Sequence, residues 1–256
     1  MADSSEYPIR YVAFLDIIGF RGLISLLDGD PSQVSFVRKL LHNVHRPKVE
    51  DFQDIFIDSD LRGQSISDAV AISANPTAAG LGHMLVAIQI LAIELMEMGF
   101  FLRGAVVKGR LYHDAEMVFG DGLVQAYRFE STIARYPRIM IPKRVGLEIE
   151  EFLKQGTFKG IFSDAIRESD DGPLYLHVLG RFEEIKELKD DKRKRLLARL
   201  IKIRDRIEGR LREAVDEPAH FEKVRWFAAY WNDVFYGVEG LSKINGPGLS
   251  IGLAVE

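Results

Sequence analysis

Short apolar runs recur along the chain and predict the strands of a sheet. Residues 11–15 (YVAFL) are almost wholly apolar, which is the pattern of a central strand covered on both faces. This run ends at Asp16. Further strands are predicted over residues 102–111, 117–119, 138–142 and 174–178.

A hairpin is predicted between two other apolar runs, around residues 54–57 and 65–73. Between them lie Ser59, Asp60 and Gly63, which are residue types that tight turns favour.

Helices are predicted where apolar residues recur every three or four positions. The clearest case runs over residues 78–98 and ends before Gly99. Other helices are predicted over residues 17–27, opening with Gly19, over residues 31–45, and over residues 121–133 with Asp121 as the N-cap. The order of elements predicts an α+β fold, with an antiparallel or mixed sheet and helices on one side.

The pattern of residue types changes beyond Glu183. Residues 188–215 are dense in Lys and Arg with a helical apolar stripe, and residues 221–235 form a second, aromatic-rich helix. We therefore expect one domain over residues 8–183 and a helical appendage, packed on that domain, over residues 184–256.

Composition limits the chemistry. The 256 residues include no cysteine, which excludes disulfides, thiolate nucleophiles, zinc ribbons and iron–sulfur ligation. Any bound metal must sit on oxygen or imidazole ligands. The net charge of −4, from 34 basic and 38 acidic residues, argues against a surface devoted to nucleic acid. The basic stretch over residues 192–206 is interrupted and flanked by acids, so it predicts a solvated or dimer-facing helix.

Neither a secretory signal nor a membrane span is expected. The first 20 residues lack a basic segment followed by an uninterrupted apolar one. The longest apolar stretch, residues 83–102, contains Gln89, Glu94 and Glu97, which would be costly in lipid. We expect a buried helix there, no membrane partner, and a cytoplasmic protein.

Two aspartates, Asp16 and Asp68, stand where a strand gives way to a turn. If their strands are neighbours, the carboxylates converge at one end of the sheet and can bind Mg²⁺, which in turn binds substrate phosphates. The glycine-containing turn that follows, from Ile17 to Phe20, can direct free N–H groups toward those phosphates. The alternative is that both acids are ordinary turn residues.

Two further polar features favour structural roles. Arg103, at a strand start, either touches phosphate or pairs with an acid, and we favour the acid. Tyr112, His113 and Asp114 form the expected tip of a hairpin.

Four motifs in order over residues 11–130 resemble the catalytic domain of class III nucleotidyl cyclases. The first is the Phe-x-Asp-Ile-x-Gly-Phe pattern of residues 14–20, and the second is the hairpin aspartate, Asp68. The third is an arginine-led strand with two spaced glycines over residues 103–110 (RGAVVKGR). The fourth leads into a helix and is matched by Phe119, Gly120, Asp121, Ala126, Arg128 and Glu130.

This resemblance implies a ferredoxin-like βαββαβ core and a two-metal mechanism. Asp16 and Asp68 would hold two Mg²⁺ or Mn²⁺ ions, with the Ile17 carbonyl as an extra ligand. Arg110 would bind the triphosphate, and Arg128 would stabilise charge on the α-phosphate as the ribose 3′-hydroxyl attacks it. The site of the family lies between two protomers, so a homodimer is implied.

Other positions of the nucleotide site follow from the same resemblance. Gly19 and Phe20 belong to the phosphate turn, where Phe20 is either core or a wall of the site. The two positions that recognise the base in purine cyclases are Gln64 and Met117 here, and Gln64 can hydrogen-bond a smaller base. The family's asparagine four residues before the helix arginine is Val124, and its C-terminal hairpin lysine has no match.

One branch of the family fits most of the chain, the bacterial Pycsar anti-phage pyrimidine cyclases. The segments that carry this resemblance are YVAFLDIIGF, SISDAV, LRGAVVKGRLYHD, VFGDGLVQAYRFE and YPRIMI. It implies conversion of UTP, or less favoured CTP, to a 3′,5′-cyclic monophosphate that acts on a separate effector. The alternatives are a non-catalytic nucleotide-binding homologue and a purine (adenylate or guanylate) cyclase.

Overall fold

The computed structural model describes residues 7–20, 24, 34–35, 38, 56–66, 68–169 and 171–249. Its chain divides into two compact units, which we describe separately. The first comprises Met1–Glu94 and Phe100–Val178, and the second comprises Leu95–Gly99 and Leu179–Glu256.

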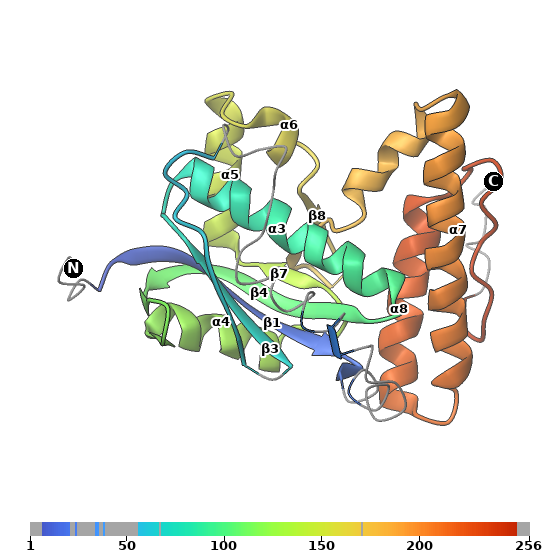
Figure 1. Ribbon diagram of the computed structural model, residues 1–256, viewed down its shortest axis with the longest axis horizontal. Coiled ribbons are helices and arrows are strands. Elements are labelled where there is room, and N and C mark those ends of the chain that lie inside the picture. The colour runs from blue at the N-terminus through green and yellow to red at the C-terminus, as the bar shows by residue number, and fades with distance from the viewer. Residues whose placement is uncertain are drawn as a thin grey trace. The chain divides into compact units, whose positions relative to one another are not determined.

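A mixed sheet of seven strands forms the centre of the first unit, in the order β2-β3-β1-β4-β7-β9-β8 (Figure 1). All neighbouring pairs are antiparallel except β4 and β7, which are parallel. The strands are β1 (Ile9–Ile18), β2 (Arg62–Ile66), β3 (Ala69–Ala74), β4 (Phe101–Arg110), β7 (Ile139–Ile141), β8 (Ile166–Glu168) and β9 (Leu174–Leu176), and a separate hairpin pairs β5 (Tyr112–His113) with β6 (Val118–Phe119).

The first four strands of the sheet have the ferredoxin-like arrangement. Strands β2, β3, β1 and β4 lie side by side and are antiparallel throughout. Helix α3 (Ala78–Glu97) connects β3 to β4, and Ile24, Val34 and Arg38 of the β1–β2 connection are helical. The predicted α+β class with a mixed sheet is confirmed.

Helices cover both faces of this sheet, so the prediction of helices on one side is wrong. Helix α4 (Asp121–Thr132) packs on the face that carries Val12 and Val107. On the opposite face, Tyr11 donates a hydrogen bond to Glu148 of α5 (Lys143–Lys154), and α3 lies on that side too (Figure 1). Successive residues of β1 are apolar because each face of the strand meets a helix.

Helix α3 confirms the helix predicted over residues 78–98. Among the described residues it is the one helix long and apolar enough to cross a membrane, and 78% of its most apolar window is buried inside the protein. That burial is typical of a core helix.

Several predicted boundaries are wrong. Strand β1 continues through Ile18, so residues 17–18 do not begin a helix; the chain turns at Gly19 instead. The hairpin is formed by β2 and β3, with Asp68 in its turn, and Ile57 lies in a turn rather than a strand. Residues 54–55 of the predicted strand, and most of the helices predicted over residues 17–27 and 31–45, lie outside the described residues.

The remaining elements of the first unit include a short helix, α6 (Lys159–Phe162). The second unit contains a 3₁₀ helix, η2 (Gly180–Lys186), and two long helices, α7 (Asp190–Glu213) and α8 (Pro218–Val234), which confirm the two helices predicted after Glu183. Helix α7 buries Leu200, Ile203, Ile207 and Leu211, one residue per helical turn.

Candidate functional site

The two aspartates singled out from the sequence lie together at one end of the sheet. In the β1–β3 register Asp16 is opposite Ala69, the residue after Asp68. The Ile17 amide donates a hydrogen bond of 3.0 Å to the Asp68 carbonyl oxygen. The turn of the β2–β3 hairpin is therefore fixed directly beside the last residues of β1.

Asp16 belongs to a small ionic network on the α4 face of the sheet. Arg103, opposite Asp16 on β4, places Nη2 2.7 Å from Asp16 Oδ2 and 2.5 Å from Glu130 Oε1. The Glu130 side chain, from α4, is only 5% exposed, whereas Asp16 is 24% exposed. Arg103 therefore pairs with acids, as the sequence favoured.

The oxygen donors at this end suit a hard divalent cation. Asp16, Asp68 and the Ile17 carbonyl would hold it, with one Asp16 oxygen engaged by Arg103. Within the described residues, no group of three or more His, Asp or Glu side chains converges on one point. Two carboxylates leave coordination positions for water and phosphate oxygens, which is how Mg²⁺ is commonly bound.

The turn after β1 depends on a glycine. Gly19 has φ of +89°, a conformation that side chains rarely adopt, and a Cβ there would lie 3.2 Å from Phe100 Cδ1. Phe20 follows as a half-buried residue in helical conformation. The glycine thus lets the chain turn directly after β1 ends at Ile18.

Gln64 and Met117, the other predicted pair, also lie close together. Gln64 Nε2 donates a hydrogen bond of 3.3 Å to the carbonyl oxygen of Glu116, the residue before Met117. Because that partner accepts, the amide nitrogen must face it, and Oε1 is turned away. Gln64 Oε1 is buried and has no hydrogen-bond partner among the described residues. The Met117 side chain is half exposed.

The two predicted arginines lie apart from the aspartates. Arg110 is opposite Ile9 and donates to the Tyr7 carbonyl oxygen at 3.1 Å. Arg110 lies seven positions along β4 from Arg103, the partner of Asp16, a span of about 23 Å at 3.3 Å per residue. Arg128 is exposed on α4, and its guanidinium makes no hydrogen bond or ion pair in the part of the chain that the structure describes.

The start of α4 differs from its prediction. Gly120, with φ of +145°, is the N-cap residue, and the Asp121 amide donates to the Tyr7 hydroxyl at 2.9 Å. Asp121 is therefore not the cap. The helix approaches β4 closely, since a Cβ on Gly109 would lie 2.7 Å from the Gly122 Cα. This contact explains the second glycine of the 103–110 motif.

A buried polar network at the other end of β1 was not predicted. Arg10, 5% exposed, donates from Nε to Ser73 Oγ at 3.0 Å and from Nη1 to Asp60 Oδ2 at 2.8 Å. Ser73 Oγ in turn lies 2.8 Å from His113 Nδ1. Burial, followed by the charges of Arg10 and Arg62, lowers the pKa of His113 to about 4. The one sequence signal was Ser73, a polar residue at the end of a predicted strand.

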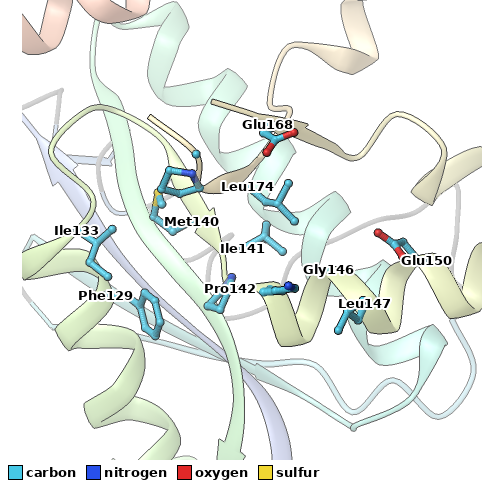
Figure 2. Close-up of a pocket in the computed structure, with 13 residues that line it drawn as sticks. Phe129, Ile133, Met140, Ile141, Pro142, Gly146, Leu147, Glu150, Glu168 and Leu174 are labelled. Atoms are coloured by element: carbon cyan, nitrogen blue, oxygen red, sulfur yellow. The ribbon is translucent and has the colours of Figure 1, made fainter. Parts of the chain in front are cut away.

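The first unit also contains a largely apolar groove of about 520 Å³ (Figure 2). None of the predicted site residues lines it. Its walls come from α4, β7, α5 and β9, and they include Phe129, Met140, Leu147 and Leu174.

Comparison with known proteins gives a limited result. No protein-family model and no curated protein matches the chain. Among solved structures, it is similar to the guanylyl cyclase Cya2, at 15% identity and a TM-score of 0.36, over 67% of this chain and 91% of that one. It is also similar to the monomeric guanylyl cyclase domain of the RhoGC fusion protein from the aquatic fungus Blastocladiella emersonii, at 16% identity and a TM-score of 0.35, over 67% and 95%. At such scores neither likeness bears on what this chain does.

Proposed function

We propose that this chain is a class III-like nucleotidyl cyclase that converts UTP, and less readily CTP, to the 3′,5′-cyclic monophosphate and pyrophosphate. The single observation that carries the proposal is the pair of acids, Asp16 and Asp68, on adjacent elements of a ferredoxin-like sheet. The four sequence motifs supply the rest, because they occur in the family's order along the chain.

The chemistry assigned to each residue follows from charge and position. Two Mg²⁺ or Mn²⁺ ions, when bound by Asp16 and Asp68, would neutralise the triphosphate and increase the acidity of the ribose 3′-hydroxyl. Arg110 binds the triphosphate, and Arg128 stabilises the charge that develops on the α-phosphate. Gly19 and Phe20 shape the phosphate turn.

We propose a homodimer with two composite sites. The span of about 23 Å between the Asp16 and Arg110 ends of the β1–β4 pair is too long for one triphosphate to bridge within one chain. Arg128, exposed and without a partner among the described residues, is free to act on a nucleotide held by the aspartates of a second copy.

The base is assigned to Gln64 and Met117. The buried Gln64 Oε1 is an acceptor that lacks a donor among the described residues. The N3–H of uracil or the amino group of cytosine can supply that donor. The cyclic product would be a second messenger in anti-phage defence, acting through a separate effector.

The test is to incubate the purified protein with an equimolar mixture of the four NTPs and Mn²⁺ and to identify cyclic products by mass. Cyclic UMP as the main product supports the proposal, and a purine product would replace the pyrimidine assignment by an adenylate or guanylate cyclase. Turnover of none of the four would exclude the enzyme.

A non-catalytic nucleotide-binding protein is the second candidate. Val124 favours it, because an exposed valine stands one turn before Arg128 where the family has an asparagine. Such a protein would show nucleotide-dependent thermal shifts without release of pyrophosphate.

A further inference from the structure

The β5–β6 hairpin, which carries Met117, is fixed to the sheet by three polar contacts. Ser73 of β3 contacts the His113 side chain, as described above. Arg62 of β2 donates from Nη1 to the His113 carbonyl oxygen. Gln64 of β2 donates to the Glu116 carbonyl oxygen. Two of the three contacts act on one residue, His113, which is 4% exposed.

The hairpin itself is tied together by Asp114. One carboxylate oxygen accepts hydrogen bonds from the Glu116 and Met117 amides, both at 2.8 Å, and the other accepts from the Tyr112 hydroxyl at 2.8 Å. The Tyr112 and Phe119 rings stack across the hairpin with centroids 5.0 Å apart. Since residues 112–119 are so cross-linked, the position of His113 determines where the Glu116–Met117 edge lies relative to Gln64.

The Ser73 hydroxyl defines the chemical state of His113. Ser73 Oγ accepts a hydrogen bond from Arg10 Nε, which has no acceptor capacity. The single hydroxyl proton of Ser73 is then directed at His113 Nδ1, so His113 acts as an acceptor and carries its proton on Nε2. Only a side chain that presents an acceptor at the Nδ1 position completes this chain of hydrogen bonds.

We propose that His113 is a positioning residue for base selection: through Ser73 and Arg62 it holds the Glu116–Met117 edge beside Gln64, and so fixes the Gln64 amide with its oxygen toward the base. This inference rests on the proposed function for the assignment of the base to Gln64. It adds what orients Gln64. The Glu116 carbonyl oxygen accepts from Nε2, and this excludes the flipped amide, which would direct its NH₂ group toward the base.

The test measures binding, so that it does not depend on turnover. Calorimetry with the α,β-methylene analogues of UTP, CTP, ATP and GTP, in the presence of Mn²⁺, gives the affinity ratio between preferred and other bases. The variants are His113→Leu, which removes the acceptor, and His113→Asn, which keeps an acceptor oxygen close to the Nδ1 position. Arg62→Met, at a side chain that is 43% exposed, removes a hydrogen bond to the same hairpin. It takes the place of His113→Leu in the test if that variant does not fold.

We expect His113→Leu and Arg62→Met to lower the affinity ratio by about tenfold, mainly by weakening the preferred base, while His113→Asn stays within about threefold of the wild type. An unchanged ratio in both, or an equal loss for all four analogues, overturns the proposal, since a merely structural role would weaken every nucleotide alike. A wild type that does not discriminate overturns it too. If the wild type discriminates but releases no pyrophosphate from NTPs, the proposed enzyme fails while the positioning role stands or falls on the ratios.

Discussion

A partly or fully buried arginine lies at each end of strand β1, but the ratio of acidic to basic groups differs between the two ends. At the Asp16 end, the guanidinium of Arg103 is shared by Asp16 and Glu130, with Asp68 beside them. At the other end, Arg10 and Arg62 share the carboxylate of Asp60. Arg10 also donates to Ser73, and the second partner of Ser73 is His113, a neutral histidine.

The Asp16 end has more carboxylates than guanidinium groups, whereas two guanidinium groups share one carboxylate at the Arg10 end. An excess of carboxylate around a single guanidinium favours a divalent cation, which would supply the missing positive charge. At the other end burial, followed by the charges of Arg10 and Arg62, disfavours protonation of His113 and lowers its pKa, while Asp114 and Asp60 act in the opposite direction. The arginine at the first end is shared by two acids, whereas Arg62 at the second end donates to the β5–β6 hairpin.

The largest expected effect comes from removing the acidic charges at the Asp16 end of β1. Asp16→Asn and Asp68→Asn should each lower kcat by at least about 1000-fold, because charge neutralisation at phosphate carries most of the catalysis. Asp16→Asn keeps an oxygen for Arg103, so the fold should survive. Cyclic product is measured by mass, with Asp216→Asn, an exposed acid of the second unit, as the matched control. Near-normal product from either variant would remove that aspartate from the site.

Removing the shared guanidinium tests stability at the same end. Arg103→Met leaves the Glu130 carboxylate buried without its cation, and should lower the free energy of unfolding by about 3–5 kcal/mol. The double variant Arg103→Met/Glu130→Gln should recover part of that loss, since the buried charge is then gone. Urea unfolding measures both. A double variant no more stable than the single one would contradict the shared-cation interpretation.

At the Arg10 end of β1, the contribution to folding stability should depend on pH instead. The pKa of His113 falls from an ordinary 6.5 in the unfolded chain to about 4 in the folded one. The unfolded state therefore binds a proton first as the pH drops, so stability is complete above about pH 6.5 and is lost toward pH 4. Between pH 7 and 4.5 the loss from this residue should be about 2–3 kcal/mol.

The control for that prediction is His113→Asn, which keeps the acceptor but does not titrate. Other histidines with a lowered pKa, His83 and His220, contribute to both proteins alike. The difference between the two unfolding curves across this pH range isolates His113. Parallel curves would show that its proton uptake is not linked to folding.

The sequence predicted the elements with a strong period, and failed where two patterns overlap. Helix α3 and strands β1 and β4 follow directly from their apolar positions. The β2–β3 hairpin was misplaced because its turn, which contains Asp68, interrupts a run that could equally be one strand. Helix α5 was missed altogether, although its buried Val145 and Ile149 are four residues apart.

The candidate site divides in the same way. Asp16 and Asp68 could be found because each lies at a strand end within a motif. The Arg10–Ser73–His113 network could not, since its members are 63 and 40 positions apart and meet only through the register of β1, β3 and the hairpin. Contacts of that kind depend on pairing that no local pattern encodes.

The smallest expected effect concerns the glycine that lets α4 reach both ends of β1. Gly109, opposite Arg10, approaches the backbone of Gly122, whereas α4 also delivers Glu130 to Arg103 at the other end. Gly109→Ala should displace the start of α4 and lower the free energy of unfolding by about 1–2 kcal/mol. Gly209→Ala, in α7 with no atom within 4 Å of its added Cβ, is the control and should be neutral or slightly stabilising. Equal stability of the two variants in urea would mean that the start of α4 can shift without cost. Helix α4 would then not connect the two ends of β1 rigidly.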